Sequence, residues 1–176
     1  YKQKKEKLGV DVLKPWDTEA QPEGIKPLQP FTTGNELLEK SIACFQKLDP
    51  FFAECLRKMD EMKHFDLDSR KGKAPGGYNC PLAETGAPFI FMNAAGQMGD
   101  VTTMVHEGGH AVHSFLAHPL ELHSFKEYPM EIAEVASMAM ELFTMDHWEP
   151  FFSNPEELKR AKQHQAATSS VLFGSA

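Results

Sequence analysis

The chain lacks any run near the roughly 18 consecutive apolar residues that a membrane-spanning helix needs, so no membrane contact is expected. It also lacks a charged segment followed by an apolar one near its start, the pattern of a secretory signal. Three cysteines without C-x-x-C spacing indicate neither a disulfide framework nor a cysteine zinc site. Cys44 and Cys55 lie among apolar neighbours and Cys80 does not, which predicts two buried free thiols. These absences favour a reducing, cytoplasmic location.

The chain also has fewer positively than negatively charged residues. Lys and Arg number 18 against 25 Asp and Glu, a net charge of −7, which excludes a general nucleic-acid binder. Gly and Pro show no period, and 13 Phe and 9 Met exclude a disordered or collagen-like chain. A length of 176 residues suits one domain. Because the chain opens at Tyr1 within a basic segment, we expect residues 1–176 to be part of a single larger helical catalytic domain, truncated at both ends.

Apolar periodicity predicts a mainly α fold with one small β element. Helices are expected over residues 2–8, 35–48, 51–64, 100–117, about 128–147 and from 155 onward. Four prolines exclude a continuous helix over residues 14–34, which we interpret as an extended connector. Residues 66–84, rich in Gly, Pro and charge, are expected to form a loop. Residues 88–93, PFIFMN, are the one convincing strand.

The motif His106-Glu107-Gly108-Gly109-His110 carries the candidate chemistry. On a helix, His106 and His110 lie one turn apart on one face, so both imidazoles can reach one metal ion. Catalytic zinc sites take three protein ligands and keep a fourth position open. Glu107 projects beside that face, where it can act on water without being a ligand. An apolar stripe on the opposite side anchors the helix: Met104, Val105, Val112, Phe115 and Leu116.

Two glycines inside this helix need an explanation. Gly108 and Gly109 cost about 0.8–1.0 kcal/mol each relative to Ala in a helix interior. We therefore expect another segment, or substrate backbone, to approach the helix closely at these positions.

The residues alone leave the third ligand open among five acids: Glu121, Glu127, Glu131, Glu134 and Glu141. Glu134 lies amid small residues on a largely apolar helix, where a carboxylate needs a partner, and Glu131 is its main rival. We interpret the broad apolar side of this helix as Ile132, Val135, Ala136, Ala139 and Phe143. A fourth protein ligand would close the site, so His113 is interpreted as an outer or structural residue. Candidates to accept the second N–H of a liganding imidazole are Asp100 (also the expected N-cap), Ser137 and Glu141.

The segment Thr103–His113, TMVHEGGHAVH, is followed after 20 residues by Glu134-Val135-Ala136-Ser137. Together with residues 70–78, RKGKAPGGY, and the strand at 89–93, it resembles the oligoendopeptidase F branch of the thimet oligopeptidase family. The resemblance covers residues 66–145 strongly. It implies a helical zinc metallopeptidase core with a deep channel, one Zn²⁺ per chain and short peptide substrates. The site residues that it implies are the zinc ligands His106, His110 and Glu134 and the catalytic carboxylate Glu107.

Two departures from the family stand out. Gly108 occupies a position where the family often has a larger residue, which alters the local wall and spares the chemistry. The His and Tyr cluster that binds substrate and stabilises the oxyanion in the family has no match after Glu134. We therefore expect the chain by itself to be a poor enzyme.

Candidate substrate contacts come from two segments. The strand containing Phe91 can bind a peptide by strand addition or serve as a plain core strand. Gly77 and Tyr78 form either a rim that touches substrate or an ordinary surface turn. The alternatives to a zinc oligopeptidase are a non-catalytic helical module with a structural metal site and a zinc hydrolase acting on another amide. The intact Glu107 favours catalysis, because a structural site has no use for it. The oligomeric state is not indicated.

Overall fold

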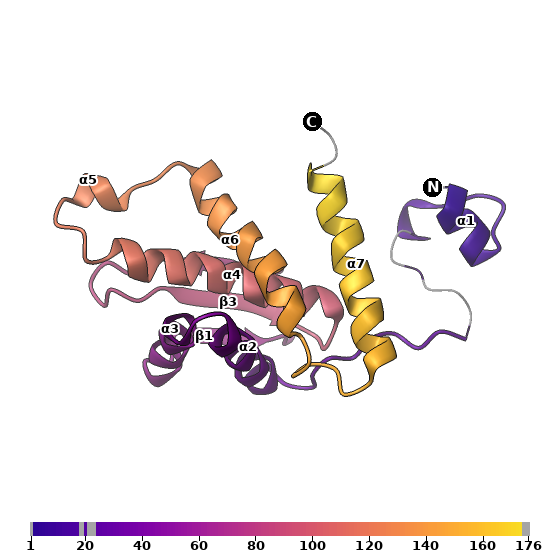
Figure 1. Ribbon diagram of the computed structural model, residues 1–176, viewed down its shortest axis with the longest axis horizontal. Helices are drawn as coiled ribbons and strands as arrows, with labels where there is room; N and C mark the ends of the chain where they lie inside the picture. The colour runs from indigo at the N-terminus through magenta and orange to yellow at the C-terminus, as the bar shows by residue number, and fades with distance from the viewer. Residues whose placement is uncertain (1, 18–19, 21–23, 174–176) are drawn as a thin grey trace.

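The computed structural model describes residues 2–17, 20 and 24–173. The mainly helical fold with a small β element is confirmed (Figure 1). The helices are α1 Lys2–Leu8, α2 Gly34–Leu48, α3 Pro50–Glu61, α4 Met98–Ala117, α5 His123–Lys126, α6 Met130–Thr144 and α7 Pro155–Phe173, with 3₁₀ turns η1 Pro15–Asp17 and η2 Met145–His147. The strands are β1 Phe65–Asp68, β2 Tyr78–Cys80 and β3 Phe89–Ala94. None of the helices among the described residues is long and apolar enough to cross a membrane.

The sheet is larger than the single strand that the sequence predicts. Its order is β1-β3-β2, with β1 parallel and β2 antiparallel to β3. In the register, Phe91 of β3 lies opposite Asp66 of β1 and Tyr78 of β2. Both outer strands fall in or beside the segment expected to be a loop. They are four and three residues long (FDLD and YNC), too short for their own pattern to identify them, so pairing with β3 makes them strands.

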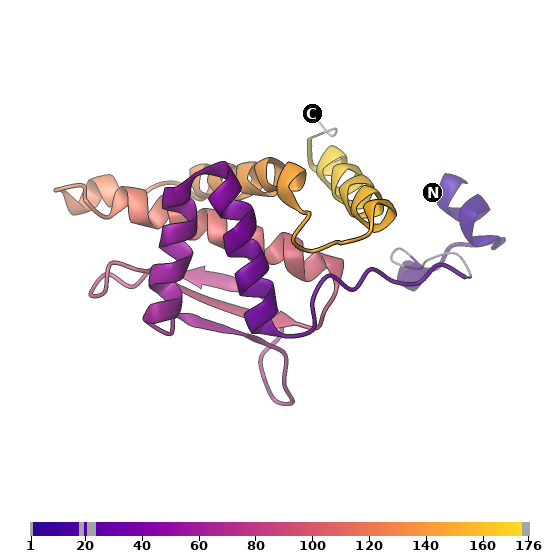
Figure 2. The same cartoon turned by 60° about the horizontal axis from the view of Figure 1, so that its bottom comes forward.

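Helix α4 lies at the centre of the fold. It contacts α6, the α2–α3 pair, β2 and β3. Figure 2 shows α2 and α3 crossing in front of the strands and α4, while Figure 1 shows α6 lying beside α4. The α2–α3 turn is capped by Asp49, whose carboxylate accepts the N–H of Phe51 at 2.8 Å, with Pro50 at the first helical position. Val101, Met104 and Val105 of α4 are fully buried, whereas Leu116 is 57% exposed and does not join the predicted stripe.

Several predicted boundaries shift in the structure. Helix α3 ends at Glu61 rather than at residue 64, because Lys63 adopts a left-handed φ of 60°. Helix α4 begins at Met98 with Gln97 as its N-cap, so the prediction of Asp100 as N-cap is wrong. Asp100 instead caps the helix from its third position: its Oδ2 accepts the backbone N–H groups of Ala95 and Gln97, both at 2.8 Å.

The orientation of α6 also differs from the prediction. The residues expected on its apolar side include Ile132, Val135 and Phe143, and these are 52%, 64% and 61% exposed. The face that packs inward combines one large apolar residue, Met140, with small and polar ones: Ala133, Ser137, Glu141 and Thr144. Exposed apolar patches of this kind mark surfaces that bind other protein segments or ligands.

The remaining predictions concern the connector and the thiols. Residues 18–19 and 21–23 of the connector lie outside the described residues; the described part holds η1 and an extended segment. Cys44 and Cys55 are buried and free, as predicted, and burial raises the pKa of both thiols to about 12.

Candidate metal centre

Helices α4 and α6 bring three potential ligands together. His106 and His110 lie on one face of α4, and Glu134 reaches them from α6. Glu134 Oε2 lies 3.3 Å from His106 Nε2 and 3.9 Å from His110 Nε2. One donor atom from each residue lies within 4.8 Å of the others.

This donor set fits a zinc ion. Two donors held about 2.1 Å from one tetrahedral ion lie roughly 3.4 Å apart, close to the separations observed here. Two imidazole nitrogens and a carboxylate oxygen are donors that catalytic zinc takes, and they leave one position open. The competing acids Glu121, Glu127 and Glu131 are exposed, and none joins this cluster in the described part of the chain.

The two glycines of the motif allow this arrangement. A Cβ on Gly109 would lie 2.8 Å from Ser137 Cα and 3.0 Å from Met140 Cβ, so α4 and α6 touch backbone to backbone. The predicted close approach of another segment is therefore confirmed at Gly109. A Cβ on Gly108 would lie 2.8 Å from Phe45 Cζ. The Phe45 ring of α2 thus occupies the space that a larger side chain at position 108 would need.

His106 is oriented by a carboxylate behind it. Its Nδ1 donates to Glu141 Oε1 at 2.7 Å, which leaves Nε2 free to face Glu134. Burial opposes protonation of His106, but the hydrogen bond to Glu141 and the charges of Glu107, Glu141 and Glu134 outweigh it and raise the pKa of His106. For His110, burial and the neighbouring His106 lower the pKa. The hydrogen bond from His106 Nδ1 thus supports the prediction that Glu141 accepts the second N–H of a candidate ligand.

Glu107 is a buried carboxylate beside the three candidate ligands. It is 7% exposed, and burial raises its pKa, with the charge of His106 opposing and that of Glu134 adding to the shift. Its backbone carbonyl accepts the Asn79 Nδ2–H at 3.2 Å, which ties strand β2 to α4 at this residue. The side chain lies close to the ligand cluster without belonging to it.

Two further residues predicted to lie around the ligands, Ser137 and His113, have contacts of their own. Ser137 Oγ donates to Glu134 Oε2 at 3.1 Å, so it contacts the carboxylate ligand rather than an imidazole. His113 stacks on Tyr128 with ring centroids 4.0 Å apart, and its buried Nδ1 has no hydrogen-bond partner among the described residues. The role predicted for His113 next to the ligands stays a prediction.

Two of the predicted substrate contacts, Tyr78 and Phe91, share one face of the sheet, whereas Gly77 faces α4. Tyr78, 51% exposed, stacks on Phe91 with centroids 5.0 Å apart and planes at 10°. Lys73 Nζ lies 4.6 Å from the centroid of the Phe91 ring. A Cβ on Gly77 would lie 3.1 Å from Thr103 Cγ2 of α4. The loop that carries Gly77 and Tyr78 is thus fixed against β3 and α4.

One substrate prediction is wrong. Strand β3 cannot accept a peptide by strand addition, because β1 and β2 already pair with its two edges. Among the described strands, β2 is an edge strand next to α4, and it takes over this candidate role.

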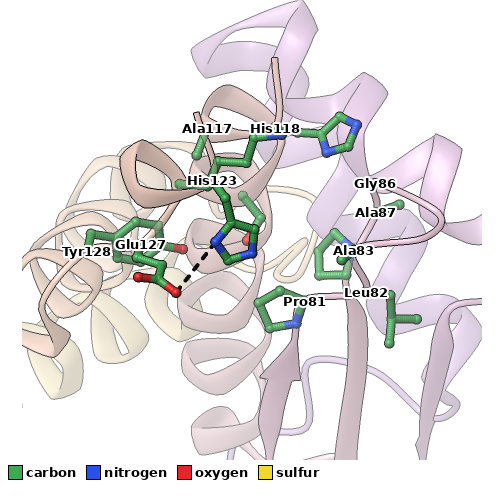
Figure 3. Close-up of a pocket in the computed structure, with 13 residues that line it drawn as sticks. Pro81, Leu82, Ala83, Gly86, Ala87, Ala117, His118, His123, Glu127 and Tyr128 are labelled. Atoms are coloured by element: carbon green, nitrogen blue, oxygen red, sulfur yellow. Dashed lines mark ion pairs between the residues drawn. The ribbon is translucent and has the colours of Figure 1, made fainter. Parts of the chain in front are cut away.

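A cavity of about 390 Å³ lies further along α4 (Figure 3). It is bounded by the β2–β3 connection, the end of α4 and the α5 region, with Pro81, Leu82 and Ala83 facing Ala117 and His118. His123 Nδ1 and Glu127 Oε1 form an ion pair of 3.6 Å at its rim. The cavity begins at Ser114, one helical turn after His110.

Sequence reasoning missed two residues that support the site. Asn79 lies in a segment expected to be a loop and carries no pattern that marks its role. Gln165 on α7 is 1% exposed and donates to Glu141 Oε2 at 2.7 Å. A signal was available for Gln165: with Leu158 and Ala161 it shares the inward face of α7, where a polar side chain needs a partner.

Comparison with known proteins gives consistent matches. The profile of peptidase family M3 matches residues 1–172. Oligopeptidase PepF of Bacillus subtilis (strain 168) is 33% identical over 90 residues, 51% of this chain and 13% of that protein. Group B oligopeptidase PepB of Streptococcus agalactiae serotype III (strain NEM316) is 26% identical over 134 residues, 76% of this chain and 22% of that protein.

A solved structure, PZ peptidase A with inhibitor 2, superposes with a TM-score of 0.86 at 32% identity over 98% of this chain and 30% of that chain. The chain therefore spans less than a third of each of these relatives. The family profile, the oligopeptidase relatives and the shared fold confirm the resemblance to the oligoendopeptidase F branch, and the chain belongs to peptidase family M3.

Proposed function

We propose that this chain is the zinc-binding part of an endopeptidase that hydrolyses peptide bonds in short oligopeptides. The observation that carries the proposal is the donor set of His106, His110 and Glu134 beside the buried carboxylate of Glu107. Membership of a peptidase family supports the reaction class. Because the chain spans 13% and 22% of two curated relatives, the activity and substrates of a whole protein belong to the same proposal. So does a cytoplasmic location, which the free thiols favour.

In this mechanism, His106, His110 and Glu134 would hold the ion. A bound Zn²⁺ supplies Lewis-acid chemistry, activating water and polarising the scissile carbonyl. The Glu107 carboxylate accepts a proton from the attacking water and then delivers it to the leaving amine nitrogen. Burial raises the pKa of Glu107, which suits a group that must hold the proton between the two transfers. Glu141 keeps the Nδ1 proton on His106, so that Nε2, which faces Glu134, would be the atom available to a metal ion.

The substrate is proposed to lie along β2 and reach the cavity beyond His110. Backbone groups on the outer edge of β2 would bind an extended peptide irrespective of its sequence. Ser114 and His118 lie four and eight residues past His110, roughly 6 and 12 Å along the helix axis. An extended peptide advances about 3.3 Å per residue, so the cavity would receive residues roughly two to four positions from the cleaved bond. Tyr78 of β2 stacks on Phe91 on the face of the sheet that points away from α4, so a role of this pair in binding substrate stays a prediction.

The alternative is a non-catalytic module with a structural metal site. Structural zinc sites are closed by four protein ligands. The cluster found among the described residues has three, and His113 stacks on Tyr128 instead of joining them. A structural site also gains nothing from burying Glu107 beside the ligands. Both observations favour catalysis.

The proposal is tested by zinc content and peptide hydrolysis in matched variants. Purified chain should bind one zinc, and Glu134→Gln should lose it or bind it far more weakly. Glu107→Gln should keep the zinc and lose hydrolysis of a short fluorogenic peptide by about 10²–10⁴-fold. A Glu134→Gln variant that binds zinc as the wild type does would refute the ligand set. A Glu107→Gln variant as active as a hydrolysing wild type would refute the catalytic role.

A further inference from the structure

Gln165 is a buried amide that links three helices. It lies on α7 and is 1% exposed. Its Nε2 donates to Glu141 Oε2 of α6 at 2.7 Å, and its Oε1 accepts from Thr102 Oγ1 of α4 at 2.8 Å. Buried side-chain amides are costly unless both ends are hydrogen-bonded, and here both ends are.

These contacts continue to the candidate metal centre. Glu141 is the residue whose Oε1 accepts from His106 Nδ1 at 2.7 Å. Each of its two carboxylate oxygens therefore accepts one strong hydrogen bond, from His106 on one side and from Gln165 on the other. The carboxylate cannot rotate about its last torsion without losing one of them, and both are charge-assisted. Its side chain is only 12% exposed, so water is a poor substitute.

The orientation of the Gln165 amide is also determined. Turning it over would face Oε1 with the Glu141 carboxylate, bringing two acceptors together. Thr102 provides a hydroxyl donor at Oε1 and so favours the orientation in which the NH₂ group faces Glu141. Thr102 lies one helical turn before His106 on α4, which means that the network begins and ends on the helix that carries the motif.

We propose that Gln165 is a positioning residue for the metal centre: by holding Glu141, it fixes the His106 ring with Nε2 directed toward Glu134. The inference rests on the proposed zinc-dependent function. In this inference, α7 supports the metal centre through Gln165, although α7 contributes no ligand. Residues that hydrogen-bond metal ligands directly, as Glu141 does with His106, typically contribute 10–100-fold in metal affinity, and Gln165 acts through Glu141.

The test compares zinc affinities of the purified 176-residue chain and three variants, by competition with a chelator of known affinity. Gln165→Met keeps the length of the side chain and cannot donate, so it separates hydrogen bonding from packing. Gln163→Ala is the control, since Gln163 is an exposed residue on the same helix. Thr102→Val removes the donor to Gln165 Oε1 and leaves Gln165 in place. Co²⁺ absorption spectra report ligand geometry independently of affinity, and circular dichroism reports folding.

Gln165→Met is expected to weaken zinc binding by about 10–100-fold and to change the Co²⁺ spectrum, while Gln163→Ala changes neither. Thr102→Val should weaken binding in the same direction by a smaller factor. A folded Gln165→Met chain with wild-type affinity and spectrum would overturn the inference. If Gln165→Met fails to fold, the result for Thr102→Val decides, and wild-type affinity there would overturn it. A wild-type chain that binds no zinc would instead refute the proposed function, so the two failures are distinguishable.

Discussion

Replacing Gly109 by alanine introduces a methyl group into the contact between α4 and α6. The new Cβ would lie 2.8 Å from Ser137 Cα and 3.1 Å from the Ala136 carbonyl oxygen. Relaxed contacts between carbon atoms are about 3.5–4.0 Å, so one helix must shift by roughly 0.7–1.2 Å. Both neighbours are backbone atoms and cannot rotate away. Because Glu134 is carried by α6, its carboxylate moves with that helix.

Two opposing contributions set the change in stability. Overpacking of this kind costs about 1–3 kcal/mol, while replacing glycine in a helix returns at most about 0.8–1.0 kcal/mol. Gly99→Ala in the same helix is the control, since a Cβ at Gly99 meets nothing within 4 Å and the variant receives only the gain. The two free energies of unfolding should therefore differ by about 1–3 kcal/mol, with about 2–4 °C in Tm for each kcal/mol.

The same shift should damage the metal centre. Ligand distances in metal sites hold to about 0.2 Å, so a displacement of α6 by several times that amount should weaken zinc binding at least about tenfold. Gly99→Ala should bind zinc as the wild type does. Thermal unfolding of metal-free protein and chelator competition measure the two effects. If Gly109→Ala matches Gly99→Ala in both, the close approach of α6 is not what requires glycine at position 109.

Near neutral pH, metal-free Glu107→Gln should unfold at a higher denaturant concentration than the metal-free wild type, because burial raises the pKa of Glu107 and disfavours its ionised form. A variant of equal or lower stability would contradict this. The stability of the metal-free chain should fall as pH rises through the raised pKa values of His106 and Glu107. It should also fall on acidification from about pH 4 toward 2, because Asp66, whose pKa is about 2, loses its charge there. Zinc should move the optimum to higher pH because it binds neutral His106, and an optimum that zinc leaves unchanged would argue against that ligand. Lys73→Met should lower the free energy of unfolding by roughly 1–3 kcal/mol, since the Lys73 side chain is 1% exposed and its Nζ donates to the Asp66 and Asp68 carbonyls. Lys71→Met, at an exposed position, should lower it little. Equal losses of the two variants in urea unfolding would contradict the buried role of Lys73.

Much of the candidate site could be predicted from the sequence because its geometry is local. A helix places residues four apart on one face, so the spacing of His106 and His110 already directs both imidazoles to one side. The cost of two adjacent helical glycines pointed to a close neighbour, and α6 is that neighbour at Gly109. The apolar periods of α2, α3 and α4 likewise predicted where these helices lie, with errors confined to a few residues at their ends.

The tertiary structure decided what depends on partners distant in the sequence. Strands β1 and β2 are four and three residues long, too short for their own pattern to identify them, and pairing with β3 makes them strands. The apolar side of α6 is exposed, because the small and polar face that accommodates Gly109 packs inward instead.

The sequence pattern also does not reveal which residues each acid contacts in three dimensions. The sequence left the third ligand open among five acids, and the packing of α6 on α4 brings Glu134 within 3.3 Å of His106. Glu141 and Gln165 meet behind His106 because α6 and α7 approach each other there. Helical spacing thus determined which side chains share a face, while the packing of helices, which depends on side-chain shape across long separations, decided what each face meets.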